Sequence, residues 1–201
     1  MRRVTPLWHP TRAALGPYKG MLRLSAALEG AADLCEDITQ ALRFDGRRLL
    51  MSEHRAQLRW KLAGADFTYQ GYNRAHDILF KNGEVVLPGS AAPEFRGDPG
   101  RVDPEEAFVA SLSGCHMLTF LAICSRRGFV VDRYEDDASG RLEKGSDGKS
   151  WIAHVTLRPL VSFRAGVEKD AEQLAALHHQ AHQDCFIANS VKTDIAVEPR
   201  R

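Results

Sequence analysis

Two cysteines in this sequence are placed so that they could form a redox pair. The chain has four cysteines, Cys35, Cys115, Cys124 and Cys185, which are spread widely and form no CxxC pair, so zinc-ribbon and thioredoxin motifs are absent. Cys115 lies among small residues in SLSGCH, and Cys185 lies in AHQDCFIANS, just past the end of a predicted helix. One thiolate could attack a peroxide oxygen and become a sulfenic acid, and the other could condense with it to a disulfide.

The other cysteine near Cys115 is a poor partner for it. Cys115 and Cys124 are nine positions apart on one predicted helix, so they point to opposite faces. Cys124 ends the apolar run FLAIC and is predicted to be a packed core thiol. Cys185, at a helix-to-strand junction, is better placed to move and react.

The helix that carries Cys115 is predicted from Pro104 to Arg127. Asp103 caps it, Pro104 suits its first position, Glu106 completes a capping box, and Gly128 ends it. A surface helix has one apolar stripe, but this one is apolar on nearly every side. A second copy of the chain would supply the missing wall, so the sequence predicts a homodimer. The alternative is a central helix wrapped entirely by its own chain.

The remaining elements indicate an α+β fold with mainly antiparallel sheet. QLRWKLAG alternates like a half-buried strand, and Asn82-Gly83 between ILFK and EVVL predicts a hairpin. Two long strands, FVVDRYEDDASGRLE and SWIAHVTLRPLVSF, follow the long helix and are joined by a turn at 145–148. A second helix, roughly Lys169 to Gln183, and a short strand VKTDIAVEP complete the order.

Composition limits the classes of function. Net charge is +1 and no Lys/Arg cluster is interleaved with aromatic residues, which argues against nucleic-acid binding. No continuous apolar run reaches the roughly 18 residues that a bilayer span needs, so no membrane association is expected. The low density of cysteines predicts a reducing, cytoplasmic compartment.

The first fifty residues differ from the rest of the chain. Residues 1–50 are predicted to be an extension, and residues 51–201 the patterned domain. The extension can be interpreted as a transit-like leader, an appended helix, or translated upstream sequence with Met51 as the natural start. The last of these, or a loose extension, is favoured because the patterned fold begins only after Met51.

Two motifs resemble a known family. DPEEAFVASLSGCHMLTF is similar to the signature of the OsmC/Ohr family (osmotically inducible protein C and organic hydroperoxide resistance protein), and AHQDCFIANSV resembles its second cysteine motif. The resemblance covers about residues 55–198. It implies an OsmC-like fold, with antiparallel sheets wrapped around long central helices in an intertwined homodimer. It also implies reduction of organic hydroperoxides without a cofactor, recycled by a dithiol such as dihydrolipoamide.

The resemblance also implies roles for particular residues. Cys115 would be the peroxidatic thiol and Cys185 the resolving thiol. Glu105 would match the glutamate that pairs with an activating arginine, although it could also serve only the helix dipole. The arginine that better-known branches carry in their first hairpin is missing from AGADF. Arg74 in GYNRAH is the best substitute and Arg96 the next, and each could equally be a solvated surface charge.

Other functions remain open from the residues alone. His178, His182 and Cys185 are spaced to line one helix face and could bind zinc, although a fourth ligand is not evident. The alternative function is a non-catalytic dimer of the same fold that binds zinc or a small ligand.

Overall fold

The computed structural model describes residues 52–167 and 169–200. These fall almost entirely within one compact unit that begins at Arg55. The interpretations of residues 1–50 given above, and the position of Cys35, lie outside the described residues. The domain boundary at residue 51 therefore stays a prediction.

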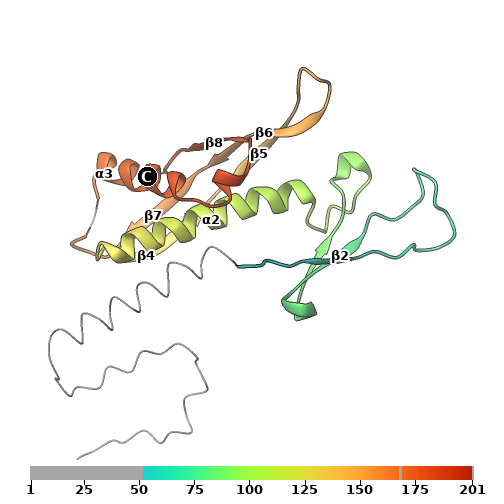
Figure 1. Ribbon diagram of the computed structural model, residues 1–201, viewed down its shortest axis with the longest axis horizontal. Coiled ribbons are helices and arrows are strands. Elements are labelled where there is room, and N and C mark those ends of the chain that lie inside the picture. The colour runs from blue at the N-terminus through green and yellow to red at the C-terminus, as the bar shows by residue number, and fades with distance from the viewer. Residues whose placement is uncertain (1–51, 168, 201) are drawn as a thin grey trace, which may run out of the picture. The chain divides into compact units, whose positions relative to one another are not determined.

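The first part of the described chain is a three-stranded antiparallel sheet. Its strands are β1 (Gln57–Arg59), β2 (His76–Phe80) and β3 (Val85–Gly89), in that order, and it lies beyond the N-terminal end of the long helix α2 (Figure 1). The predicted hairpin at Asn82-Gly83 is confirmed: the turn η2 (Lys81–Gly83) joins β2 to β3, with Asn82 at a left-handed φ of 57°. Strand β1 is shorter than its alternating sequence predicts.

The long helix α2 (Pro104–Arg126) agrees with the prediction to within one residue. A 3-10 turn, η3 (Pro93–Phe95), precedes it. Asp103 accepts a hydrogen bond from the backbone of Glu106, whose side chain accepts in turn from the backbone of Asp103, which forms the predicted capping box. Gly128 follows the helix at a φ of 70°, where a residue with a side chain would be strained.

Each of the two long strands predicted after α2 is broken in the structure. The chain forms β4 (Val131–Asp136), β5 (Ser139–Lys144), β6 (Ser150–Leu157), β7 (Pro159–Phe163), α3 (Ala171–Gln183), η4 (Ala188–Ser190) and β8 (Asp194–Val197). Strands β4 and β7 pair as one sheet, while β5, β6 and β8 form another, in which β8 runs parallel to β6.

Asp136 lies where the strands break. Its carboxylate accepts hydrogen bonds from the backbone N–H of Arg158 at 2.6 Å and from the hydroxyl of Ser113 on α2, also at 2.6 Å. The side chain thus ties both breaks to the helix. Each of the two predicted strands therefore contributes one strand to each of two sheets. Alternation of apolar residues alone does not reveal such a break.

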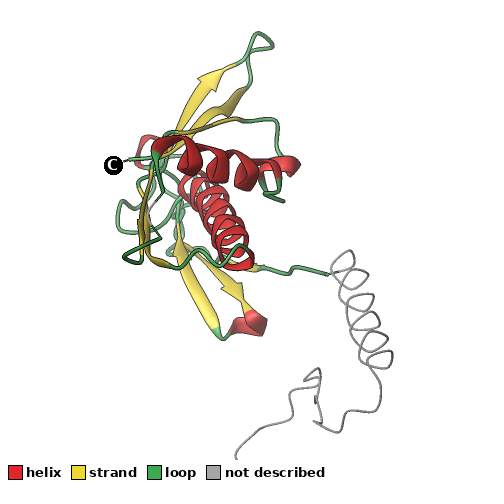
Figure 2. Cartoon of the chain, turned by 90° about the vertical axis from the view of Figure 1, so that its left-hand side faces the viewer, coloured by secondary structure: helices red, strands yellow, loops and turns green. Residues whose placement is uncertain are grey.

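Two hydrophobic clusters hold the sheets and α3 against α2. The first joins the C-terminal half of α2 to α3 and the β4–β7 sheet, around Phe120, Ile123, Cys124, Leu177 and Ala181. The second joins the N-terminal half of α2 to the β5–β6–β8 sheet, around Leu112, Val155 and Leu157. Helix α3 lies beside α2 in both views (Figures 1 and 2). The fold is α+β, as predicted.

The described part of the chain covers only one side of α2. Leu112, His116, Phe120, Ile123 and Cys124 are buried, whereas Leu118, on the other side, is 64% exposed. Among the described helices, α2 alone is long and apolar enough to cross a membrane, a test that the core helix of a soluble protein also passes. Only 28% of its most apolar stretch is buried, so residues 52–167 and 169–200 leave a large apolar face of the helix uncovered.

Candidate functional site

Cys115 and Cys185 lie side by side. Cys115 is in the middle of α2 and is half-buried, and Cys185 comes two residues after α3 and is 1% exposed. The Cys115 side chain is near enough to Cys185 to contribute to the raised pKa of the Cys185 thiol. The structure therefore brings together, in one chain and as free thiols, the two cysteines that the sequence singled out.

A tight turn after α3 holds the Cys185 thiol inward. The Cys185 N–H donates to the carbonyl of His182 at 3.3 Å, and the Cys185 carbonyl accepts from the N–H of Asn189 at 3.0 Å. The backbone N–H of Ala188 points at the Cys185 sulfur at 3.5 Å. Burial and the neighbouring Cys115 thiol raise the pKa of Cys185 to about 11. Cys185 is thus a protonated thiol at neutral pH, which suits a second step rather than the first attack.

Cys124 is separate from this pair, as predicted. It is 1% exposed and packs in the cluster formed by α2 and α3, and burial raises its pKa. A buried, protonated thiol in an apolar cluster has little reactivity.

Glu105 and Arg74 do not meet Cys115 within the chain. Glu105 lies in the first turn of α2, half-buried, and no residue of the described chain pairs with its carboxylate. Since α2 is continuous, Glu105 and Cys115 are about 15 Å apart along its axis. A local break in the helix could bring the two side chains together within one chain, but α2 has no such break.

Arg74 is held by aromatic residues in the loop before β2. Its guanidinium lies 3.8 Å from the ring centroid of Tyr72 and 5.3 Å from that of Tyr69, and it donates to both of their carbonyls. It lines an open cavity of about 520 Å³ whose wall includes Pro104, the neighbour of Glu105. Arg96, the second candidate, is an exposed residue with a left-handed φ of 64° at the end of η3.

A second cavity lies along the N-terminal half of α2. It has a volume of about 720 Å³, and its lining includes five carboxylates, those of Glu94, Asp103, Glu105, Glu106 and Asp136. Apolar side chains, including Val109 and Ile152, line the rest, and the cavity reaches the Ser113–Asp136 hydrogen bond. It therefore ends two residues short of Cys115 along the helix.

Sequence reasoning missed a buried histidine pair next to the cysteines. His116 Nε2 and His178 Nδ1 are hydrogen-bonded at 3.0 Å, and their rings are stacked with centroids 5.3 Å apart. Both residues are at most 2% exposed, and burial lowers the pKa of each to about 4. His116 could have been found from its helical spacing, because it lies on the same face of α2 as the core residues Leu112 and Phe120.

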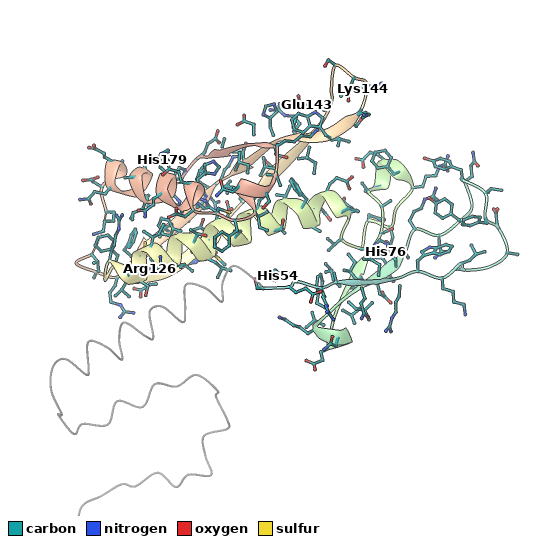
Figure 3. The ribbon with its side chains drawn as sticks, in the orientation of Figure 1. His54, His76, Arg126, Glu143, Lys144 and His179 are labelled. Atoms are coloured by element: carbon teal, nitrogen blue, oxygen red, sulfur yellow. The ribbon has the colours of Figure 1, made fainter. Side chains whose placement is uncertain are left out.

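The histidines of α3 do not form the metal site considered from their spacing. His178 is turned into the core and bonded to His116, and its neighbour His179, labelled in Figure 3, is exposed. Within residues 52–167 and 169–200, no group of three or more His, Cys, Asp or Glu side chains is arranged to hold a metal ion.

Comparisons with known proteins agree with this fold. A model of the OsmC family, described as OsmC-like protein, matches residues 97–200. The structure of an OsmC-like protein of unknown function from Vibrio cholerae is 43% identical, with a TM-score of 0.71, over 75% of this chain and 100% of that one. No curated protein matches the chain.

More distant structures share the fold. The organic hydroperoxide resistance protein OhrB of Bacillus subtilis is 19% identical with a TM-score of 0.55, over 74% of this chain and 98% of its own. An organic hydroperoxide resistance protein from Legionella pneumophila is 15% identical with a TM-score of 0.57, over 74% of this chain and 96% of its own. From the family model and the Vibrio structure, the chain belongs to the OsmC-like family, which includes organic hydroperoxide resistance proteins.

Proposed function

We propose that the protein is a thiol-dependent peroxidase that reduces organic hydroperoxides. The observation that carries this proposal is the proximity of a half-buried thiol, Cys115, to a buried thiol, Cys185. A peroxide could reach the half-buried Cys115, whereas the Cys185 thiol is buried. The names of the hydroperoxide resistance proteins in the family support the choice of substrate class.

The chemistry proceeds in three balanced steps. The Cys115 thiolate attacks the terminal peroxide oxygen, the O–O bond breaks, and the alkoxide takes a proton to leave as an alcohol. The Cys185 thiol then attacks the Cys115 sulfenic acid, which forms a disulfide and releases water. A dithiol such as dihydrolipoamide reduces this disulfide by thiol–disulfide exchange and is itself oxidised to a cyclic disulfide.

Replacing the resolving thiol tests the proposal. Wild-type protein treated with one equivalent of cumene hydroperoxide should lose two thiols per chain and contain a Cys115–Cys185 bridge, seen by non-reducing mass spectrometry. Cys185→Ser should form no intrachain bridge, and Cys115 should pass to sulfinic acid as peroxide increases.

The same experiment distinguishes the other functions. If peroxide leaves the thiols unchanged and a parallel assay finds bound zinc, the protein would be a zinc-binding dimer and not a peroxidase. Unchanged thiols without zinc would leave a small-ligand carrier. A bridge from Cys115 to Cys35 would move the resolving role to the N-terminal extension.

The working unit that we propose is a homodimer built on the uncovered face of α2. Small residues, Ala110, Ser111 and Gly114, lie near Cys115, so a second backbone could approach closely there. A Cβ added at Gly114 would meet no atom within 4 Å in the chain, so space is available beside it. The exposed Leu118 continues this face toward the C-terminal half of the helix.

We expect light scattering to show a stable dimer at micromolar concentration, and Leu118→Glu to weaken it by placing a charge in the interface. Val130→Glu is the matched control, because Val130 is 40% exposed in the loop that follows α2 and lies off this face. A folded wild-type monomer at micromolar concentration would contradict the proposed dimer.

The dimer also offers a way to complete the site. Within one chain Glu105 is about 15 Å from Cys115, but antiparallel copies of α2 that cross near Gly114 would bring Glu105 of one chain toward Cys115 of the other. We propose that Arg74 bridges the two and lowers the pKa of the Cys115 thiol. Among residues 52–167 and 169–200 the Glu105 carboxylate has no partner, which supports this arrangement.

The pH dependence of Cys115 alkylation should change in Arg74→Ala. Loss of the cation should move the midpoint toward the free thiol value of about 8.5 and slow alkylation at neutral pH. The measurement is made in a parent protein that carries both Cys124→Ala and Cys185→Ala. Cys115 is then the only described cysteine left to react. The same profile in Arg74→Ala and its parent would remove Arg74 from the site and favour Arg96.

A further inference from the structure

We propose that the buried His116–His178 pair is a positioning device that holds the resolving thiol Cys185 in register with Cys115. This inference rests on the proposed function for its biological use. Its structural basis is that His116 lies on α2, which carries Cys115, and His178 lies on α3, which leads directly into the turn with Cys185. His116 is the next residue after Cys115 on α2, and His178 lies about two turns before Cys185 on α3.

Disulfide formation demands accurate placement. The two sulfur atoms must come to about 2.05 Å with a Cβ–S–S–Cβ dihedral near 90°, and Cα atoms more than about 7 Å apart cannot be bridged. Cys185 lies past the last residue of α3, so any slide or rotation of α3 along α2 is passed on to its sulfur. Apolar contacts such as those of Phe120 with Leu177 and Ala181 do not by themselves fix such a slide, because they are not directional.

The hydrogen bond of the histidine pair is directional, unlike the apolar contacts between the two helices. One ring donates an N–H to the lone pair of the other at 3.0 Å, which restricts both the separation and the register of the helices. Phe120 stacks on His178 with ring centroids 4.3 Å apart, so the His178 ring is held from the other side as well. The bond is buried, and water cannot compete for it.

The pair has a cost that stability alone does not explain. His116 Nδ1 and His178 Nε2 are buried without a hydrogen-bond partner in the described chain. Two apolar side chains of similar size at these positions would avoid both unpaired atoms and could be neutral or stabilising. A buried polar pair retained at such a cost is best explained by the geometry that it enforces.

A second polar tie between the helices gives a matched control. Arg127 donates to the side-chain oxygen of Gln180 at 2.5 Å, but this bond is exposed and lies at the C-terminal end of α2, away from Cys115. Figure 3 labels Arg126 at that end of the helix. If any polar contact between α2 and α3 sufficed, removal of either tie would have the same effect on the thiols.

The test measures how readily Cys115 and Cys185 form a disulfide without peroxide. In exchange with glutathione, two protein thiols and one glutathione disulfide give the protein disulfide and two glutathione molecules, and the equilibrium reports the effective concentration of one thiol toward the other. We expect His178→Leu to lower it at least tenfold. His178→Asn, whose amide can still bond to His116 Nε2, should restore most of it, and Gln180→Ala should match wild type.

A second measurement follows the peroxide reaction of the same variants. His178→Leu should slow disulfide formation and increase sulfinic acid, while sulfenic acid on Cys115, trapped by dimedone, should form at the wild-type rate. Equal effective concentrations in wild type and His178→Leu would overturn the proposal. So would equal losses in His178→Leu and His178→Asn, which would assign the effect to packing. A wild type that bridges with glutathione but not with peroxide would refute the peroxidase and leave this inference intact.

Discussion

Cys115→Ser is expected to reduce hydroperoxide consumption to that of buffer alone, whereas Cys124→Ala should keep the wild-type rate within about twofold. Cys115 is the half-buried thiol of the neighbouring pair, and serine at that position cannot form a sulfenic acid. The measurement is the initial rate of cumene hydroperoxide loss with a dithiol in excess.

Cys124→Ala is a fair control because Cys124 lies on the same helix as Cys115, and each substitution removes one sulfur atom. Cys124 lies in the apolar cluster, so its removal should cost about 1–2 kcal/mol of stability without reaching the site. Alanine avoids the buried hydroxyl that serine would introduce. Equal loss of activity in folded Cys115→Ser and Cys124→Ala would mean that the two faces of α2 had been assigned wrongly.

Local signals predicted the elements of the fold better than their breaks. The capping residues Asp103 and Glu106 placed α2 correctly, and the Asn82-Gly83 turn located the first hairpin, because each is decided within a few residues. The division of each long strand into two was missed. It depends on Asp136, whose partners Ser113 and Arg158 are more than twenty positions away in sequence.

The candidate site shows the same limit. The spacing of cysteines on the predicted helices, together with the family resemblance, singled out Cys115 and Cys185, which the structure brings close together. The His116–His178 bond was missed because it joins two helices, and no pattern within either helix shows that their faces meet. His178 was instead grouped with His182 and Cys185 along α3, the only relation that spacing in one helix can show. Residues that meet between chains, as proposed for Arg74 and Glu105, are further still from such patterns.

The buried histidine pair should make the protein lose stability in mild acid. In the unfolded chain a histidine has a pKa of about 6.5, whereas burial lowers the pKa of His116 and of His178 to about 4. His182 lowers the pKa of His116 further, Asp136 opposes this, and Tyr134, whose own pKa is raised by burial, faces His178. Between these pH values the unfolded state binds more protons than the folded state, so stability rises with pH.

The stabilisation is therefore fully present above about pH 7 and is lost as the pH falls from 6.5 toward 4. A shift of this size corresponds to about 3 kcal/mol for one histidine, and we expect a loss of about 5 kcal/mol for the pair between pH 7.5 and 4.5, because the unfolded chain takes up a proton on both rings while both stay largely neutral in the folded state. Urea unfolding at pH 7.5, 5.5 and 4.5, at one fixed protein concentration, measures it. Carboxylates also titrate below pH 5, so the comparison must be with a variant that lacks only the histidines.

His116→Leu combined with His178→Leu is that variant, because replacing both partners by apolar groups leaves no unpaired atom and should keep the protein folded. Its free energy of unfolding should fall by about 5 kcal/mol less than that of wild type between pH 7.5 and 4.5. His179→Gln removes an exposed histidine from the same helix and should follow the wild-type curve. Parallel curves for wild type and the double variant would show that the two histidines take up protons as readily in the folded protein as in the unfolded chain, and would contradict a pair that stays neutral in mild acid.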